Sequence, residues 1–156
     1  MRMMRVAAVA VVLGMALTAR AAEKIFDPSR DSETDLKAAI AQAKAEHKNI
    51  LMDVGGNWCS WCVLVERTMH EDAELNALLS KNYVLLHVDF SQGHENTEFL
   101  KHYPKPTGYP AWYVLSPSGK LLKAEDTSEL EQTHKLAAGY NRDALKQFLT
   151  ENAPKP

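Results

Sequence analysis

The chain has 156 residues, of which 46% are hydrophobic and 24% are charged, and its formal net charge is −2. This length suits one domain with its own hydrophobic core. No cluster of basic residues with interleaved aromatic residues occurs, so nucleic acid is excluded as an expected partner.

Residues 1–22 have the pattern of a secretory signal peptide. Arg2 and Arg5 give a positively charged start, residues 6–17 form an apolar run, and small residues around Ala21 fit a cleavage site. The run is shorter than the ~20 residues that a spanning helix needs, which favours cleavage over an uncleaved anchor. We therefore expect export to a periplasm, where disulfides persist.

Residues 23–32 are expected to form an extended leader before a folded domain at residues 33–152, and residues 153–156 a short tail. Ser32 begins a capping-box pattern, and apolar residues then recur at helical spacing up to about His47. The first element of the domain is therefore a predicted helix.

The rest of the chain alternates between strand and helix patterns. The expected elements are a buried strand at 49–54, helices at 59–70 and 73–79, a strand at 83–90, a short helix at 95–101, strands at 111–115 and 120–123 joined by a turn, a surface insertion at 125–135, an edge strand at 136–139 and a last helix after Asn141. This order predicts an α/β fold in which helices flank both faces of a central mixed sheet.

The only two cysteines, Cys59 and Cys62, lie at the start of the second expected helix. The partial positive charge and free N–H groups of a helix N-terminus favour a thiolate, so we interpret the pair as a dithiol/disulfide redox site. Inert core cysteines and a metal-binding pair are the alternatives. Zinc needs four ligands and there is no second cysteine pair, so we expect no metal and no cofactor.

Three groups of residues resemble the thioredoxin superfamily over residues 33–152. Trp58-Cys59-x-x-Cys62 follows a strand and opens a helix, Asp53 lies six residues before Cys59, and Gly108-Tyr109-Pro110-Ala111 precedes the hairpin. The run from Trp58 through Trp61 to Glu66 is most similar to the exported thioredoxin-like proteins of the thioredoxin-7 type. The resemblance implies a thioredoxin fold.

The resemblance also implies roles for the residues at the site. Cys59 is expected to be the attacking thiol and Cys62 the resolving thiol. Asp53 would exchange a proton with the buried cysteine, unless it lies at an exposed strand end. Pro110 is expected to be cis and to face the sulfur atoms, and the Tyr109 backbone to pair with an extended substrate; a trans proline that begins a strand is the alternative.

The two tryptophans beside the cysteines have different predictions. Trp58 matches the tryptophan that lines the active site in the family. Trp61 replaces part of the commonest Gly-Pro dipeptide and either shapes an apolar rim for substrates or is buried against a neighbouring helix. No lysine occurs in the strand after residue 83, where thioredoxin has one near Asp53.

Taken together, these features predict an exported thiol–disulfide oxidoreductase, with reduction of protein disulfides favoured. The expected partners are protein disulfide or dithiol substrates and a membrane-bound electron-donor protein, and the protein is expected to be a monomer. The alternatives are a periplasmic dithiol oxidant and a non-catalytic client-binding, chaperone-like module.

Overall fold

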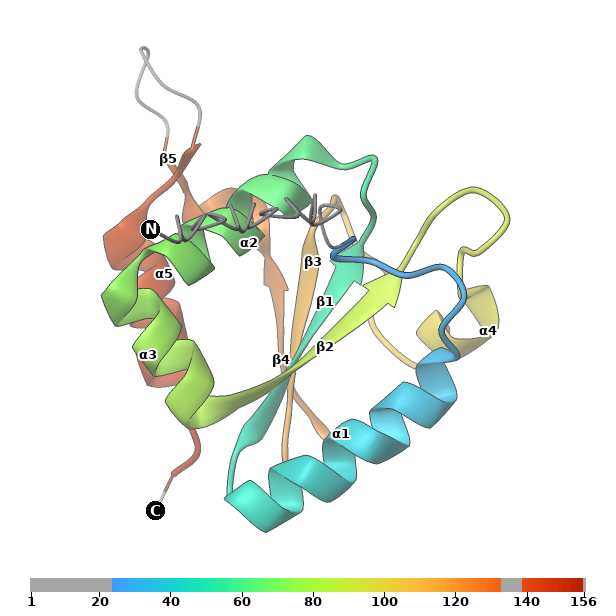
Figure 1. Cartoon of the computed structure of the whole chain (residues 1–156), viewed down its shortest axis with the longest axis horizontal. Coiled ribbons are helices and arrows are strands. Elements are labelled where there is room, and N and C mark those ends of the chain that lie inside the picture. The colour runs from blue at the N-terminus through green and yellow to red at the C-terminus, as the bar shows by residue number, and fades with distance from the viewer. Residues whose placement is uncertain (1–23, 133–138, 156) are drawn as a thin grey trace, which may run out of the picture.

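A four-stranded mixed sheet forms the centre of the computed structural model, which describes residues 24–132 and 139–155. The strand order is β2-β1-β3-β4, as Figure 1 shows. Strand β1 (Asn49–Gly55) pairs in parallel with the edge strand β2 (Tyr83–Asp89) and antiparallel with β3 (Ala111–Leu115), and β3 pairs antiparallel with β4 (Leu121–Asp126).

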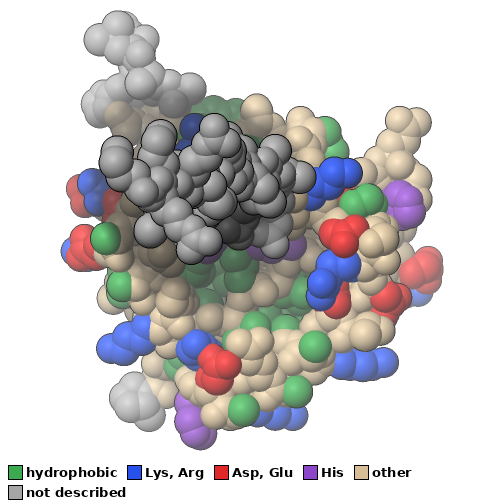
Figure 2. Space-filling model, in the orientation of Figure 1, with side chains coloured by type: hydrophobic (Ala, Val, Ile, Leu, Met, Phe, Trp, Pro, Cys, Tyr) green, Lys and Arg blue, Asp and Glu red, His purple; other side chains and the backbone are tan. Residues whose placement is uncertain are grey.

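Helices cover both faces of this sheet, as the sequence predicts. Helix α1 (Ser32–Glu46) and the short α4 (Thr97–Leu100) pack on one face. Helices α2 (Ser60–Glu71), α3 (Ala73–Asn82) and α5 (Arg142–Glu151) pack on the other. Figure 2 shows charged side chains of both signs interspersed over the visible part of the α1 face.

Strand β1 is buried along its whole length, which confirms the strand that its apolar residues predict. Side chains alternate between the faces of a strand. Ile50 and Met52 therefore enter the core beneath α1, while Leu51 enters the core beneath α2 and α5. By the same alternation Asp53 points toward α2, and this places a carboxyl group on the side where the cysteines lie.

The expected surface insertion at 125–135 is wrong for residues 125–132. Strand β4 continues to Asp126, a 3₁₀ helix follows at Thr127–Leu130, and β5 (Glu131–Gln132) pairs with β6 (Gly139–Tyr140). Thr127 and Leu130 are buried. The residues around them are polar and show no helical or strand period, so the sequence does not reveal that these two side chains face inward. Residues 133–138, and with them most of the expected edge strand at 136–139, lie outside the described residues.

The segment before α1 is attached to the domain through Phe26. The Phe26 ring is fully buried in one cluster with the two cysteines. Its backbone is held by Asn57, whose Nδ2 donates to the Phe26 carbonyl at 2.5 Å and whose Oδ1 accepts from the Phe26 N–H at 3.3 Å. This part of the predicted leader therefore closes over the end of β1.

The helices within residues 24–132 and 139–155 are too short or too polar for any of them to cross a membrane.

Candidate active site

Cys59 and Cys62 form a disulfide at the N-terminus of α2, with their Cα atoms 5.2 Å apart. Cys59 is the N-cap residue, and its Sγ accepts a hydrogen bond from the Cys62 N–H at 3.1 Å. Cys62 is fully buried, whereas Cys59 retains 6% exposure. Cys59 is therefore the sulfur atom that an incoming thiol or disulfide reaches first.

The loop before β3 faces the Cys59 sulfur. The Tyr109–Pro110 peptide bond is cis, as predicted. The Tyr109 carbonyl oxygen lies 3.6 Å from Cys59 Sγ. Thr127 Oγ1 donates to the Pro110 carbonyl oxygen at 2.7 Å, so the 3₁₀ helix that the sequence did not predict holds this loop in place.

An exposed aromatic surface lies beside this loop. The Trp58 side chain is 58% exposed, and its Nε1–H donates to the Phe90 carbonyl at 2.9 Å. The Tyr109 ring packs edge-on against Trp58 and stacks on Phe90, with ring centroids 5.8 and 4.8 Å apart. Trp58 and Phe90 also line a cleft of about 640 Å³. An extended polypeptide next to Cys59 would meet this surface.

Trp61 has a different environment from Trp58. Its ring is half-buried and packs edge-on against Tyr140, with centroids 5.4 Å apart. It also contacts both the core beneath α2 and the cluster of Phe26 and the cysteines. This contact favours the packing interpretation of Trp61 over an apolar rim for substrates.

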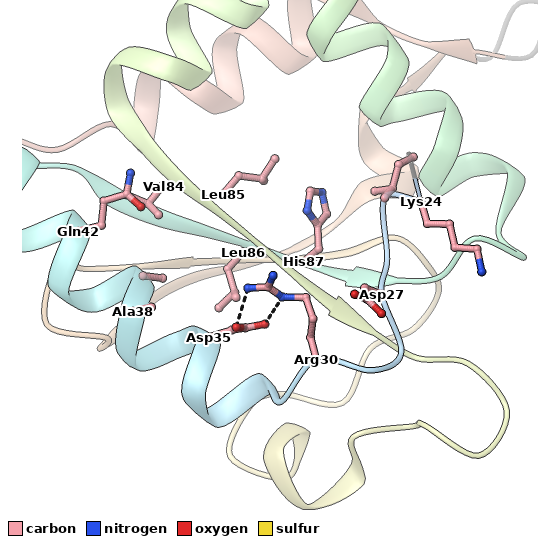
Figure 3. A pocket seen from close by; sticks show the side chains of 12 residues that line it. Lys24, Asp27, Arg30, Asp35, Ala38, Gln42, Val84, Leu85, Leu86 and His87 are labelled. Atoms are coloured by element: carbon pink, nitrogen blue, oxygen red, sulfur yellow. Dashed lines mark hydrogen bonds and ion pairs between the residues drawn. The ribbon is translucent and has the colours of Figure 1, made fainter. Parts of the chain in front are cut away.

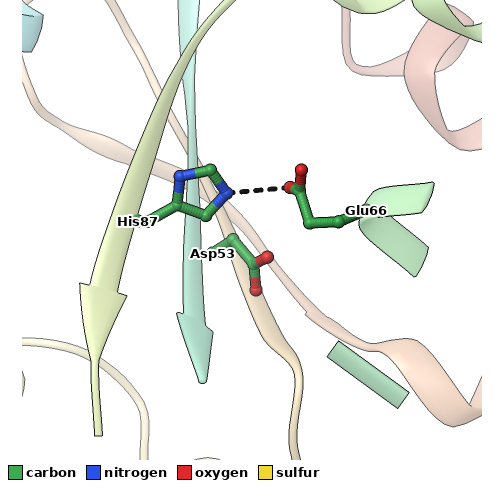
Figure 4. A group of neighbouring side chains, drawn as sticks. All are labelled: Asp53, Glu66 and His87. Atoms are coloured by element: carbon green, nitrogen blue, oxygen red, sulfur yellow. Dashed lines mark hydrogen bonds and ion pairs between the residues drawn. The ribbon is translucent and has the colours of Figure 1, made fainter. Parts of the chain in front are cut away.

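A buried cluster of three titratable side chains lies where β1, β2 and α2 meet. Asp53 comes from β1, Glu66 from α2 and His87 from β2 (Figure 4). One carboxyl oxygen of each acid and one ring nitrogen of His87 all lie within 4.8 Å of one another. Glu66 Oε1 is 2.8 Å from His87 Nε2, and Glu66 Oε2 is 3.1 Å from His70 Nε2. Asp53 is fully buried and neither carboxyl oxygen has a hydrogen-bond partner among the described residues.

These surroundings shift the acid–base behaviour of two members. Burial raises the pKa of Asp53 to about 7; His87 opposes this rise, and Glu66 adds to it. Burial disfavours the charged His87 ring, but the hydrogen bond to Glu66 and the charges of Asp53 and Glu66 outweigh it and raise the pKa of His87. A carboxyl group with a pKa near neutrality is suited to exchange protons during catalysis.

Asp53, Glu66 and His87 also form the one group within residues 24–132 and 139–155 whose ligand atoms lie close enough together to hold a metal ion. His87 Nε2 and Glu66 Oε1 are, however, already hydrogen-bonded to each other. A metal ion would have to replace that bond, so we interpret the cluster as an acid–base group.

The sequence points to Asp53 but not to all of its neighbours. Glu66 follows Cys62 by four residues, and this spacing places both on one side of a helix. His87 interrupts an apolar strand, yet only the parallel register, in which Asp53 lies opposite His87, brings the two together. Phe26 carries no sequence signal that would place it against the cysteines.

Gly55 makes room for the Cys62 sulfur. A Cβ atom on Gly55 would lie 2.6 Å from Cys62 Sγ and 3.0 Å from the Phe26 ring. We expect Gly55→Ala to destabilise the protein by about 1–3 kcal/mol through overpacking, measured by chemical denaturation. The control is Gly108→Ala, where a Cβ would meet no atom of the described residues within 4 Å. Equal stabilities of the two variants would contradict this account.

Comparisons with known proteins agree with this geometry. A family model described as thioredoxin-like matches residues 31–117. The thiol:disulfide interchange protein DsbD 2 of Pseudomonas aeruginosa is 28% identical over 111 residues, which are 71% of this chain and 18% of that protein. Spermatogenesis-associated protein 20 of Rattus norvegicus is 30% identical over 84 residues, which are 51% of this chain and 11% of that protein. The chain thus spans a small part of each relative.

Solved structures show the same architecture. A disulphide isomerase from Xylella fastidiosa Temecula1 superposes with a TM-score of 0.69 at 26% identity, over 84% of this chain and 98% of that one. The C-terminal domain of DsbD from Neisseria meningitidis, in its oxidised form, superposes with a TM-score of 0.56 at 17% identity, over 78% and 96% of the two chains. These matches confirm the predicted thioredoxin fold, with its mixed sheet and helices on both faces.

Proposed function

The chain belongs to the thioredoxin-like family of disulfide oxidoreductases, and we propose that it is an exported enzyme that reduces protein disulfides through Cys59 and Cys62. One observation carries the proposal: the two cysteines form a disulfide at a helix N-terminus, with the Tyr109 carbonyl 3.6 Å from the outer sulfur. This arrangement provides both a stabilised thiolate and a backbone acceptor for a substrate.

The reaction begins with the reduced pair. The Cys59 thiolate attacks one sulfur of a substrate disulfide, and the other substrate sulfur leaves as a thiolate that takes up a proton. The Cys62 thiol then loses its proton and attacks Cys59, which releases the second substrate thiol and closes the Cys59–Cys62 disulfide. Two electrons have then passed from the enzyme to the substrate.

Asp53 is the proposed acceptor of the Cys62 proton. It projects from β1 on the same side as Gly55, where an added Cβ atom would lie 2.6 Å from the Cys62 sulfur. Its pKa of about 7 means that both protonation states are populated at neutral pH. The carboxylate therefore removes a proton from Cys62 when the mixed disulfide is resolved, and the carboxylic acid returns one when the enzyme is reduced again.

Substrate binding is assigned to the aromatic surface beside Cys59 and to the loop of Tyr109 and Pro110. The Tyr109 backbone, whose carbonyl oxygen lies 3.6 Å from the Cys59 sulfur, pairs with an extended substrate segment. Trp58 provides an exposed apolar surface for the side chains that flank the substrate cysteine. Trp61 supports this region from beneath through its contact with Tyr140.

The proposed location and partners follow from the N-terminal pattern and from one relative. Residues 1–22 resemble a signal peptide, and one relative is named a thiol:disulfide interchange protein. We propose that the domain acts as a monomer in a periplasm and receives electrons from a membrane-bound donor.

The direction of electron flow is tested by the reduction potential of the Cys59–Cys62 pair, measured by equilibration with glutathione. For a reductase we expect a reduction potential of about −270 mV. A potential of about −120 mV would contradict electron flow from the protein to its substrate and support the alternative, a periplasmic dithiol oxidant. Reduction of insulin disulfides by the purified protein would show the activity itself.

A further inference from the structure

Asp53 has no direct contact with solvent, so a proton that it takes from Cys62 needs a route out. Glu66, in the same cluster, is nearly as buried. His87 is different, because 24% of its side chain is exposed and it lines a cleft of about 630 Å³. We propose that His87 carries protons between Asp53 and this cleft, while Glu66 holds the imidazole ring in position. The inference rests on the proposed oxidoreductase function.

The ring of His87 is placed between the buried acid and the open cleft. Asp53 and His87 lie opposite each other in the parallel register of β1 and β2. A carboxyl oxygen of Asp53 and a ring nitrogen of His87 lie within 4.8 Å of each other, a distance that a small side-chain rotation or one water molecule can bridge. In Figure 4 one ring nitrogen of His87 points at Glu66 and the other points away from it. An imidazole can accept a proton on one ring nitrogen and release a proton from the other.

The cleft is polar enough to admit water. It follows the edge strand β2 and is bounded by the segment before α1 and by α1 itself (Figure 3). Lys24, Asp27, Arg30 and Asp35 line it, and Arg30 donates two hydrogen bonds to Asp35 at 2.6 and 2.7 Å. Figure 3 shows His87 on the opposite side of β2 from Leu86, so the ring reaches the cleft across the strand edge.

The charges around His87 decide how easily it gains a proton. Asp53 from β1 and Glu66 from α2 favour the charged ring, and Arg30 from the segment before α1 opposes it. The Phe26 ring packs edge-on against the imidazole, with centroids 5.2 Å apart, and shields it on the side of the cysteines. The net effect of these contacts is a raised pKa for His87, which favours uptake of a proton by the ring.

The proposed transfer is balanced in each half of the cycle. When Cys62 attacks the mixed disulfide, its proton passes to the Asp53 carboxylate and then to neutral His87. The imidazolium is stabilised by Glu66 and releases the proton to water in the cleft. When the donor protein reduces the Cys59–Cys62 disulfide again, the same groups return one proton to Cys62.

His70 is a second imidazole next to Glu66, and it supplies the control. Its side chain is 50% exposed and contacts Glu66 Oε2, but it is not among the side chains clustered with Asp53. A role that consisted only in pairing with Glu66 would be shared by His70 and His87. A role in carrying protons from Asp53 would belong to His87 alone.

The test compares His87→Gln with His70→Gln in single-turnover reduction of a peptide disulfide. Glutamine keeps a hydrogen bond to Glu66 but cannot carry a proton. We expect His87→Gln to slow release of the reduced peptide about tenfold, to increase the solvent deuterium isotope effect, and to be partly rescued by added imidazole. We expect His70→Gln to stay within about twofold of the wild-type rate.

Two results would overturn the inference. One is a His87→Gln protein with the wild-type rate and isotope effect, and the other is equal slowing by both variants without rescue by imidazole. In either case an active wild-type enzyme would leave the proposed function intact. A wild-type protein that does not reduce disulfides at all would instead reject that function.

A measurement on the wild-type protein avoids the risk that His87→Gln fails to fold. In ¹⁵N-histidine spectra, the His87 ring should change its protonation state over the pH range in which the rate of peptide release changes. A His87 ring that keeps one protonation state between about pH 5 and about pH 9 would contradict the relay.

Discussion

Replacing Cys59 with serine is expected to lower the rate of insulin-disulfide reduction by at least about a thousandfold, to the uncatalysed background. Cys59 is the sulfur that retains exposure and the one that faces the Tyr109 carbonyl. A serine hydroxyl is far less acidic than a thiol and cannot form a disulfide with the substrate. The decrease is measured in an insulin-turbidity assay with dithiothreitol as the electron donor.

Cys62→Ser is the matched control for this variant. It keeps the attacking thiol but removes the resolving one, so we expect a mixed disulfide between Cys59 and the substrate to accumulate on non-reducing gels. If Cys59→Ser still reduced insulin, the proposal that the protein is a thiol–disulfide oxidoreductase acting through Cys59 would be rejected. If the wild-type protein reduced insulin only at the background rate but bound client proteins, and Cys59→Ser bound them equally well, the client-binding module would be the better description.

Asp53→Asn is expected to remove a large pH dependence of stability. The folded pKa of Asp53 is about 7, well above its ordinary value of 3.8, because the carboxyl group is buried. The folded protein therefore binds more protons than the unfolded chain between these two values. The Asp53 contribution to the free energy of unfolding is most favourable below pH 3.8 and is lost as the pH rises to about 7.

The expected size of this loss is about 4 kcal/mol, since one pKa unit corresponds to about 1.36 kcal/mol. His87, whose pKa is also raised, adds a loss of the same sign as the pH rises through its folded pKa. Asparagine cannot ionise, so Asp53→Asn should be more stable than the wild type at pH 8 and should approach it near pH 4. Urea unfolding of the oxidised proteins at several pH values measures the difference.

Asp126→Asn provides the control for the sign of this effect. Hydrogen bonds from Thr107 and Ser128 lower the pKa of Asp126, so its contribution to stability is present above pH 3.8 and is lost as the pH falls. This variant should therefore keep the decline of stability between pH 4 and 7. A wild-type protein whose stability is constant over that range would contradict the burial argument for Asp53.

Most of the fold follows from local patterns in the chain. From the first helix to β3, every expected element is present, with ends shifted by a few residues. Strand β1 was identifiable because it is continuously apolar, and the helix at the cysteines because Cys59 is followed by a helical run. The segment at 125–132 does not follow from local patterns, since its two buried residues, Thr127 and Leu130, are held by tertiary contacts and show no period.

Local residue patterns identify most of the elements, the cysteine pair at a helix N-terminus, and the candidates Asp53 and Pro110. Capping, periodicity and turn formation act over a few neighbouring residues, so they can be recognised in the chain. The packing of Phe26 against Cys62, and the meeting of Glu66 and His87 beside Asp53, are visible in the folded chain alone, since Glu66 and His87 are 21 residues apart. These contacts depend on strand register and on the packing of α2, which side chains distant in the sequence determine together.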